Sequence, residues 1–251
     1  MNLGLQGKHA IVTGGSRGVG REMALCLADE GAQVTLTYHG HKEKADEVVK
    51  AIKGKGKVAN AVQMNLADPT SIKEMVKQAL QFGVVDILVN NAAVWPTCYI
   101  KDMSLLEWNE TLQTNLTSVF LVSQLFVQHC VQQKRAGTLL NIISQAAFHG
   151  STTGHAHYAA SKSGIVGFAK SLAREHAKDK ITVNNLALGI VETDMIQKSL
   201  QEKEEYYINR IPIGRVAQPR EMAEIATFLV SEKANYVTGS TFDATGGMLM
   251  R

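Results

Sequence analysis

Cysteine is scarce in this sequence. The 251 residues include only Cys26, Cys98 and Cys130, and no two of them form a C-x-x-C pair or a spacing used by metal sites. Structural disulfides are typical of oxidising compartments, whereas a few isolated cysteines suit a compartment in which thiols stay reduced. We therefore expect free thiols and a cytoplasmic location.

Long apolar runs and a strong net charge are also missing. No run approaches the roughly 18 consecutive apolar residues of a membrane helix, and no charged-then-apolar leader precedes the first expected strand. The formal net charge of +3 does not indicate a nucleic-acid partner, which normally binds a clustered basic face. The four lysines between residues 50 and 57 fit a solvated helix end, where cations complement the helix dipole. The sequence thus predicts a protein that binds neither membrane nor nucleic acid.

The composition is that of one globular α/β domain, with 45% hydrophobic and 20% charged residues. Apolar, β-branched runs alternate with longer amphipathic stretches, which is the pattern of βαβ units and a parallel sheet. We expect strands at 9–13, 33–38, 58–64, 87–90, 138–143, 182–188 and 241–244. We expect helices at 18–30, 42–53, 69–82, 105–134, 157–178 and 220–231. The prediction is a single-domain Rossmann fold over residues 1–251, with a seven-stranded parallel sheet and helices on both faces.

Two further features concern boundaries and connections. Asp68 offers an N-cap acceptor, Pro69 suits the first helical position, and Gly83 stands where that helix should end. The segment 192–215 is charged and only weakly periodic, and it separates the sixth strand from the last helix. Its position favours a lid over a substrate site, with an ordinary surface excursion as the alternative.

A glycine-rich turn follows the first expected strand and opens the first expected helix, with the order Thr13-Gly14-Gly15-Ser16-Arg17-Gly18-Val19-Gly20. Glycine lets a backbone turn sharply and approach a pyrophosphate, and the start of a helix presents free N–H groups to it. The spacing is G-x-x-x-G-x-G, which differs from the common G-x-G-x-x-G fingerprint. Its place at a strand–helix junction, ahead of a second βα unit, nevertheless predicts nucleotide binding.

The end of the second strand bears on the choice between NAD and NADP. An acidic residue there would bind a ribose 2′-hydroxyl and repel a 2′-phosphate. This chain has Tyr38 and His39 at that position, with Arg17 in the glycine turn and Lys42 nearby. Cations attract the phosphate dianion and no carboxylate opposes them, so we expect NADP(H) as the cofactor.

A tyrosine and a lysine stand four residues apart at Tyr158 and Lys162, and therefore on one face of the expected helix. Free tyrosine has a pKa of about 10, and a neighbouring ammonium favours the phenolate that acid–base chemistry near neutrality requires. Ser144 follows the fifth strand, where the carboxyl end of a parallel sheet would place its hydroxyl in a crevice. Asn115 lies in an otherwise apolar helical stretch, either as a functional group or as a packing amide with its hydrogen bonds satisfied.

Taken in order, these motifs resemble the short-chain dehydrogenase/reductase family over essentially the whole chain. The resemblance rests on the glycine turn, Asn90-Asn91-Ala92, Asn115, Ser144, and Tyr158 with Lys162. It implies that Tyr158 is the general acid/base and that Ser144 orients the substrate oxygen. It also implies that Lys162 binds the nicotinamide ribose and lowers the pKa of the tyrosine, and that Asn115 holds a water in a proton relay.

The resemblance, together with the turn and strand-end arguments, gives an expected set of cofactor and substrate contacts. The cofactor contacts are Gly14, Ser16, Arg17, Gly18, Val19, Gly20, His39, Asn65, Leu66, Asn91, Ala92, Tyr158, Lys162, Val191 and Thr193. The substrate contacts are Ser144, Trp95, His155 and Tyr158.

Within the family the chain is most similar to bacterial 3-oxoacyl-acyl-carrier-protein reductases of fatty acid biosynthesis. The shared stretches include Thr114-Asn115-Leu116, Glu192-Thr193-Asp194-Met195 and Gly246-Gly247-Met248, whereas Ala93 and Leu188 replace a usual glycine and a usual proline. The resemblance implies reduction of a carbonyl to a secondary alcohol, a homotetramer, and possible delivery of the substrate on an acidic carrier protein. Four basic residues would help to dock such a carrier, or are ordinary solvated helix ends: Lys134, Arg135, Lys178 and Lys180.

Trp95 and the histidines His149, His155 and His157 are unlike a typical fatty-acyl reductase. They suit a sugar or polyol dehydrogenase of the glucose-dehydrogenase type, which is the alternative function. No carboxylate or thiol accompanies the histidines at ligand spacing, so we expect no metal. A third possibility, an NADP-binding sensor without turnover, does not explain why the serine, tyrosine and lysine are all present.

Overall fold

Seven parallel strands form a single sheet at the centre of the structure, in the order β3-β2-β1-β4-β5-β6-β7. The computed structural model describes residues 2–151 and 153–250. The strands are β1 (His9–Val12), β2 (Gln33–Tyr38), β3 (Ala59–Gln63), β4 (Ile87–Asn90), β5 (Gly137–Ser144), β6 (Ile181–Leu188) and β7 (Thr241–Ala244). The expected fold class is confirmed.

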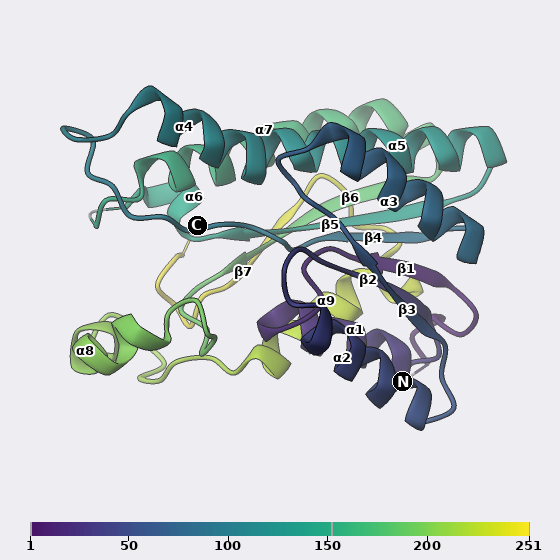
Figure 1. Cartoon of the computed structure of the whole chain (residues 1–251), viewed down its shortest axis with the longest axis horizontal. Helices are drawn as coiled ribbons and strands as arrows, with labels where there is room; N and C mark the ends of the chain where they lie inside the picture. The colour runs from purple at the N-terminus through teal and green to yellow at the C-terminus, as the bar shows by residue number, and fades with distance from the viewer. Residues whose placement is uncertain (1, 152, 251) are drawn as a thin grey trace.

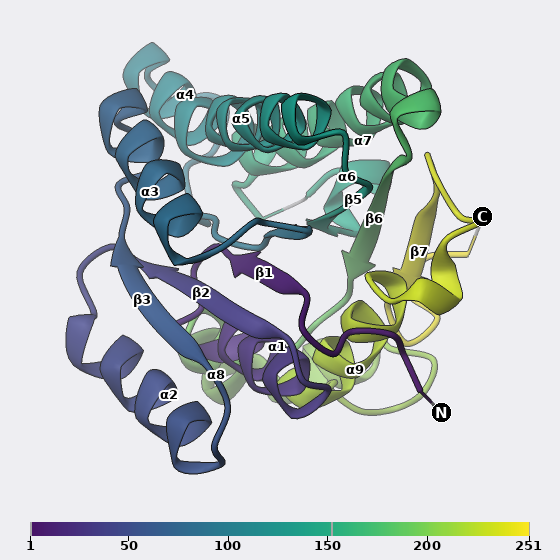
Figure 2. The same cartoon turned by 90° about the vertical axis from the view of Figure 1, so that its right-hand side faces the viewer.

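Helices cover both faces of this sheet, so the molecule has three layers (Figures 1 and 2). One face carries α1 (Gly18–Asp29), α2 (Lys42–Gly54) and α9 (Pro219–Leu229). The other carries α3 (Pro69–Phe82), α4 (Leu105–Leu112), α5 (Ser118–Gln133) and α7 (Ala156–His176). Two large clusters of buried apolar side chains fill the space on either side of the strands. Apolar residues at helical and strand spacing therefore reach the core that their periodicity predicted.

The expected strands and α-helices begin and end within two residues of the observed ones. One expected helix is interrupted, and two observed α-helices were not expected. The helix predicted over 105–134 contains a π-helical segment at Gln113–Thr117. The short helix α6 (Ala146–His149) and the lid helix α8 (Gln197–Ile208) were not predicted. Helix α8 has no buried side chain among its described residues and is broken at Lys203, where φ is −144°. A helix without an apolar face leaves no periodicity in the sequence.

The start of α3 shows how the sequence positions an element. The Asp68 Oδ1 accepts a hydrogen bond from the Thr70 N–H at 2.8 Å, Pro69 is the first helical residue, and the helix ends at Gly83. A side-chain acceptor satisfies one of the orphan N–H groups of a helix start, and proline costs nothing where no N–H partner exists. These three boundary predictions are confirmed.

A ladder of buried amides crosses the sheet from β4 to β7. The Asn141 Oδ1 accepts from the Asn90 Nδ2 at 3.0 Å, and the Asn141 Nδ2 donates to the Asn185 Oδ1 at 3.0 Å. The Asn185 Nδ2 in turn donates to the Thr241 hydroxyl at 3.1 Å. Asn141 and Asn185 have no exposed surface, so water cannot satisfy their side-chain amides. The hydrogen bonds of the ladder satisfy them instead. The ladder fixes the relative register of β4, β5, β6 and β7 three residues before Ser144.

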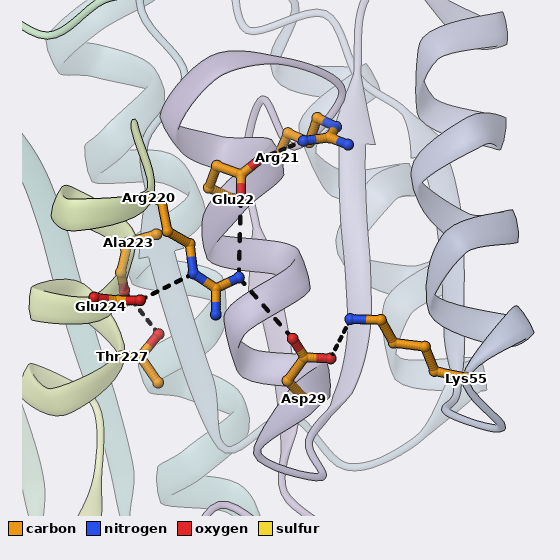
Figure 3. A network of polar contacts seen from close by, with 8 residues as sticks. All are labelled: Arg21, Glu22, Asp29, Lys55, Arg220, Ala223, Glu224 and Thr227. Atoms are coloured by element: carbon orange, nitrogen blue, oxygen red, sulfur yellow. Dashed lines mark hydrogen bonds and ion pairs between the residues drawn. The ribbon is translucent and has the colours of Figure 1, made fainter. Parts of the chain in front are cut away.

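A second polar network joins α9 to α1 (Figure 3). The Arg220 guanidinium lies 3.1 Å from Glu224 on its own helix, and 3.9 and 4.0 Å from Glu22 and Asp29 on α1. Lys55, just beyond α2, reaches the same Asp29 at 2.7 Å. Helix α1 begins at the glycine turn, and α9 follows the lid segment. The network therefore holds the helices next to these two segments together on one face of the sheet.

Nowhere in residues 2–151 and 153–250 is a helix both long and apolar enough to cross a bilayer.

Candidate active site

The glycine turn is built for close approach to an anion. Gly14 has a φ of +67°, and a side chain at Gly20 would put its Cβ 2.3 Å from the Gly14 carbonyl oxygen. Helix α1 starts at Gly18 without a side-chain cap, since Arg17 at the N-cap makes no capping hydrogen bond. Its first N–H groups and its positive dipole end are therefore available for a phosphate, which is what a dinucleotide supplies.

Two neighbouring strands hold this turn in place. The Gly15 N–H donates to the Thr37 carbonyl at 2.9 Å, and the Gly14 N–H donates to the Thr37 hydroxyl at 3.1 Å. From β4, the Asn91 Nδ2 donates to the Thr13 carbonyl at 2.9 Å. Asn91 was predicted as an adenosine contact; the structure shows that its amide also anchors the backbone of the phosphate-binding turn.

A cavity of about 770 Å³ opens at the carboxyl ends of the strands, beside the turn. This is where an open α/β sheet places its ligands. Of the predicted site residues, all but Asn115 line it: Gly14, Ser16, Arg17, Gly18, Val19, Gly20, His39, Asn65, Leu66, Asn91, Ala92, Trp95, Ser144, His155, Tyr158, Lys162, Val191 and Thr193. Segments from across the chain therefore meet at one site, as a bound dinucleotide with an adjoining substrate would require.

The reacting groups come from β5 and α7. Ser144 is the last residue of β5, and Tyr158 and Lys162 stand one turn apart on α7. The Lys162 ammonium lies 5.8 Å from the centroid of the Tyr158 ring, and it donates to the Ile142 carbonyl at 2.8 Å. This bond to β5 fixes the lysine beside the tyrosine and below Ser144.

Burial dominates the ionisation of both α7 groups. It raises the pKa of Tyr158 to about 12, against a smaller opposing effect of a hydrogen bond with Ser144. It lowers the pKa of Lys162 to about 8. In the free protein burial thus raises the pKa of Tyr158, and a lowering of this pKa by Lys162 stays a prediction.

Asn115 lies behind the cavity wall instead of lining it. Its side chain has no exposed surface; the Oδ1 accepts from the Val94 N–H at 2.9 Å, and the Nδ2 donates to the Val94 carbonyl at 2.9 Å. The residue sits in the π-helical segment, where the backbone bonding pattern changes. The packing-amide interpretation accounts for the side chain, and a water held near Asn115 stays a prediction.

The substrate side of the cavity is polar and aromatic. Trp95 stacks on His155 with ring centroids 4.1 Å apart, and the His155 Nδ1 hydrogen-bonds to the Pro96 carbonyl at 2.8 Å. Burial lowers the pKa of His155, which favours its neutral form. Gln145 also lines the cavity, and its buried Oε1 has no hydrogen-bond partner among residues 2–151 and 153–250. The sequence prediction included Trp95 and His155 but missed Gln145, whose only signal is its position directly after Ser144.

The three histidines do not form a shared site. His149 and His155 line the cavity, whereas His157 is fully buried and does not. Across the described part of the chain, no three His, Cys, Asp or Glu side chains are grouped so that they could hold a metal ion. All three cysteines are free.

The lysines near the glycine turn make different contacts from one another. Lys42 pairs with Asp46 on its own helix, at 2.5 Å. Lys44, two residues further into α2, approaches Asp194 of the lid segment at 3.2 Å. Arg17 approaches the same Asp194 oxygen at 3.6 Å. Lys44, and not Lys42, is therefore the α2 lysine that shares Asp194 with Arg17.

Known proteins match the chain over nearly its whole length. The family model described as Enoyl-(Acyl carrier protein) reductase matches residues 14–249. The 3-oxoacyl-[acyl-carrier-protein] reductase FabG of Staphylococcus aureus is 42% identical over 244 residues, which cover 97% of this chain and 98% of that protein.

Solved structures of short-chain dehydrogenases and related enzymes also match the chain over nearly its whole length. A short chain dehydrogenase from Burkholderia cenocepacia in complex with NADP has a TM-score of 0.90 at 32% identity, covering 97% of this chain and 98% of that one. A putative 2-deoxy-d-gluconate 3-dehydrogenase from Agrobacterium tumefaciens with bound NADP gives 0.90 at 32% identity, covering 100% and 99%. With this fold, this cavity and these relatives, the chain belongs to the short-chain dehydrogenase/reductase family of oxidoreductases, and within it is most similar to the 3-oxoacyl-acyl-carrier-protein reductases.

Proposed function

We propose that this protein uses NADP(H) to interconvert a carbonyl and a secondary alcohol, and that it is a 3-oxoacyl-(acyl-carrier-protein) reductase. The observation that carries the proposal is the convergence of Ser144, Tyr158 and Lys162 on one wall of a cavity whose other end is the glycine turn. The 42% identity to the S. aureus reductase supports the substrate class, and the two NADP-bound neighbours support the cofactor.

The residues fit such a cofactor. Gly14 and Gly20 let the turn pack closely against Asn91, and the uncapped start of α1 supplies N–H donors to a pyrophosphate. Arg17 supplies positive charge in the glycine turn, while Lys162 lines the cavity and would bind the nicotinamide ribose. When bound, the nicotinamide would supply a hydride to the substrate carbonyl carbon.

The protein's own groups manage the proton and the oxygen. Ser144 is in place to donate a hydrogen bond to the substrate oxygen, on which negative charge builds as the carbonyl is reduced. Tyr158 keeps its proton at neutral pH, since its pKa is about 12, and is therefore ready to give that proton to the oxygen. The Lys162 ammonium stabilises the phenolate that remains, and its bond to the Ile142 carbonyl prevents it from turning away.

A sugar or polyol dehydrogenase is the second candidate, and the polar substrate wall favours it. Gln145, His149 and Arg210 line the cavity together with the Trp95–His155 stack. The unpartnered Gln145 Oε1 calls for a hydroxyl donor, which an alkyl chain lacks and a polyol has. The Agrobacterium neighbour carries a sugar-acid name. A non-catalytic NADP-binding sensor would leave the serine and tyrosine hydroxyls in the cavity without a use.

Docking of an acidic carrier protein at Lys134, Arg135, Lys178 and Lys180 is part of the first proposal. The patch lies where β5 and β6 begin, and Ser144 is seven residues further along β5, or roughly 23 Å at the rise of a strand. Arg135 is also engaged, because its guanidinium pairs with the buried Asp86 at 2.7 Å. Charge reversal at Arg135 would thus disturb the fold, and Lys178→Glu is the cleaner test: it should weaken a carrier-bound substrate and spare a free thioester.

A substrate panel tests the proposal. Purified protein is assayed with 3-oxoacyl thioesters, keto sugars and small ketones in the presence of NADPH, and with the corresponding alcohols in the presence of NADP⁺. The 3-oxoacyl thioesters should give the highest kcat/KM. Preference for a keto sugar or its polyol would select the second candidate, and absence of turnover with the whole panel would favour the sensor. We also propose that the protein is a homotetramer and that it is located in the cytoplasm.

A further inference from the structure

His155 is the residue directly before α7, and its imidazole is buried in the wall of the cavity. Only 4% of the residue is exposed, and it is one of the residues that line the cavity. Its backbone carbonyl accepts a hydrogen bond from the Ala159 N–H at 2.9 Å, which makes it part of the first turn of α7. Tyr158 is three residues further along this turn and lines the same cavity. The imidazole and the phenol thus reach the cavity from the same end of α7.

Two contacts fix the orientation of the His155 ring. The Nδ1 atom lies 2.8 Å from the Pro96 carbonyl oxygen, and the Trp95 indole stacks on the ring with centroids 4.1 Å apart and an angle of 21° between the planes. A backbone hydrogen bond of 2.7 Å from the Cys98 N–H to the Gly154 carbonyl joins the two segments that hold these groups. The ring cannot turn without losing both contacts, so its orientation is set before a substrate arrives.

This orientation determines what His155 can offer to a ligand. A carbonyl oxygen only accepts hydrogen bonds, so the Nδ1 atom facing Pro96 carries a proton. Burial lowers the pKa of His155 from its ordinary value of 6.5, so the ring is neutral at pH 7. A neutral imidazole with its proton on Nδ1 has a lone pair and no proton on Nε2. At Nε2, His155 is therefore a hydrogen-bond acceptor.

The Nε2 acceptor is free. It has no hydrogen-bond partner among residues 2–151 and 153–250. It is not shut off from solvent either, in contrast to the Gln145 Oε1 and both ring nitrogens of His157. Because His155 lines the cavity, this accessible acceptor lies at the cavity wall. The hydroxyls of Ser144 and Tyr158 can donate to the substrate oxygen, so an acceptor on the same wall suits a second group of the substrate.

We propose that the His155 Nε2 accepts a hydrogen bond from an N–H or O–H group that the substrate carries in addition to its reacting carbonyl. The proposal rests on the carbonyl–alcohol chemistry of the proposed function, and it makes His155 a specificity-determining residue for that chemistry. A simple alkyl ketone has no such donor. The amide N–H in the arm of a pantetheine thioester is one, and so is a hydroxyl of a polyol.

Two pairs of substrates, each with and without the donor, test the proposal in the presence of NADPH. The first pair is the 3-oxobutanoyl thioester of N-acetylcysteamine and that of its N-methyl derivative, which lacks the amide proton. The second pair is hydroxyacetone and methoxyacetone. Within the pair that the protein reduces, the donor should raise kcat/KM about fivefold, as expected for one neutral hydrogen bond. The difference should lie in KM, because this bond is made equally in the ground state and the transition state.

Three variants show whether His155 is the acceptor. His155→Phe keeps a ring for the stack but has no acceptor, so both members of the pair should be reduced with equal kcat/KM. His155→Gln supplies an amide oxygen and should restore part of the preference. His176→Phe is the matched control; it lies at the other end of α7, does not line the cavity, and should keep the whole preference. NADPH titration and thermal unfolding check the cofactor site and the fold of each variant.

The outcomes separate this proposal from the proposed function. Equal kcat/KM within every pair that the wild type reduces overturns the role of His155 and leaves the carbonyl–alcohol chemistry standing. This comparison needs no variant, so it decides the matter even if His155→Phe does not fold. A preference that persists in a folded His155→Phe also overturns the proposal. A preference within the hydroxyacetone pair alone supports the acceptor and selects the polyol candidate. Reduction of neither pair contradicts the proposed function and the role of His155 together.

Discussion

Replacing Lys162 with methionine should stabilise the free protein while abolishing its activity. Lys162 is 3% exposed, and burial lowers its pKa from 10.5 in the unfolded chain to about 8. At pH 7 the folded protein must keep a desolvated ammonium, which costs about 3 kcal/mol relative to the unfolded chain. Methionine has a similar shape and no charge, but it leaves the Ile142 carbonyl without its donor, a loss of about 1 kcal/mol. The expected net gain at pH 7 is about 2 kcal/mol.

The gain should depend on pH in a direction fixed by the sign of the shift. The folded-state pKa lies below the unfolded value, so unfolding takes up a proton between pH 8 and 10.5. Wild-type stability therefore rises with pH across this window, and the cost of the buried lysine falls to about 1 kcal/mol at pH 9.5. The advantage of Lys162→Met should thus shrink by about 2 kcal/mol between pH 7 and pH 9.5.

Urea unfolding at these two pH values measures both effects, with the exposed Lys170→Met on the same helix as control. Lys170→Met should change the unfolding free energy little and equally at both pH values. NADPH titration should show weaker binding by Lys162→Met, since the ribose contact is lost. A Lys162→Met variant that is less stable at pH 7, or a difference that does not change with pH, would refute the reasoning about the buried ammonium.

Three further predictions concern the sheet, the cofactor and the assembly. Asn141→Ala should lower the free energy of unfolding by about 2–4 kcal/mol in urea titrations, because Asn90 and Asn185 lose buried partners; the exposed Asn109→Ala should cost little, and an equal loss would contradict the ladder. Tyr38→Asp should lower the ratio of kcat/KM for NADPH to that for NADH, since a carboxylate would face the 2′-phosphate; an unchanged ratio would move that phosphate elsewhere. Light scattering at micromolar protein should give a tetramer mass, and a monomer mass would contradict the assembly.

Much of the fold could be predicted because its signals are local. The strand–turn–helix order, the cap at Asp68 and the period of each amphipathic helix are all properties of short windows. The lid helix α8 was missed because it buries none of its described side chains, so no apolar stripe records it. The π-helical segment around Asn115 was missed because a change of backbone bonding leaves the apolar spacing almost unaltered.

The assembly surface shows the same limit of local patterns. By sequence alone, five residues give the two long helices more apolar surface than one side of a sheet obviously needs, which would suit a contact between copies: Leu116, Val119, Phe120, Ile165 and Phe168. The structure buries Val119 and Ile165 in a cluster of the chain itself, with Leu116 and Phe168 packed against it. Only Phe120, at 42% exposed, remains an open apolar side chain of this set. Periodicity shows that a residue faces something, but does not show what it faces.

For the site, too, part could be predicted from the sequence and part could not. Motif order brought together the residues that line the cavity, because parallel strands deliver their carboxyl ends to one edge. Pairings between segments could not be foreseen. Arg17 with Lys44 and Asp194, and the bond from Lys162 to Ile142, depend on distances between elements that no local pattern encodes. The burial that raises the pKa of Tyr158 could not be foreseen for the same reason, because burial is a property of the whole fold.

Turnover by Tyr158→Phe tests the central claim most directly. The substitution removes one hydroxyl and keeps the ring, so the fold and NADPH binding should survive; fluorescence titration checks the binding. With the carbonyl substrate that the wild type reduces fastest, kcat should fall by at least about 10²–10⁴-fold, the usual contribution of a general acid. A Tyr158→Phe protein that binds NADPH normally and keeps a near-native kcat would contradict the account of how this cavity performs its chemistry.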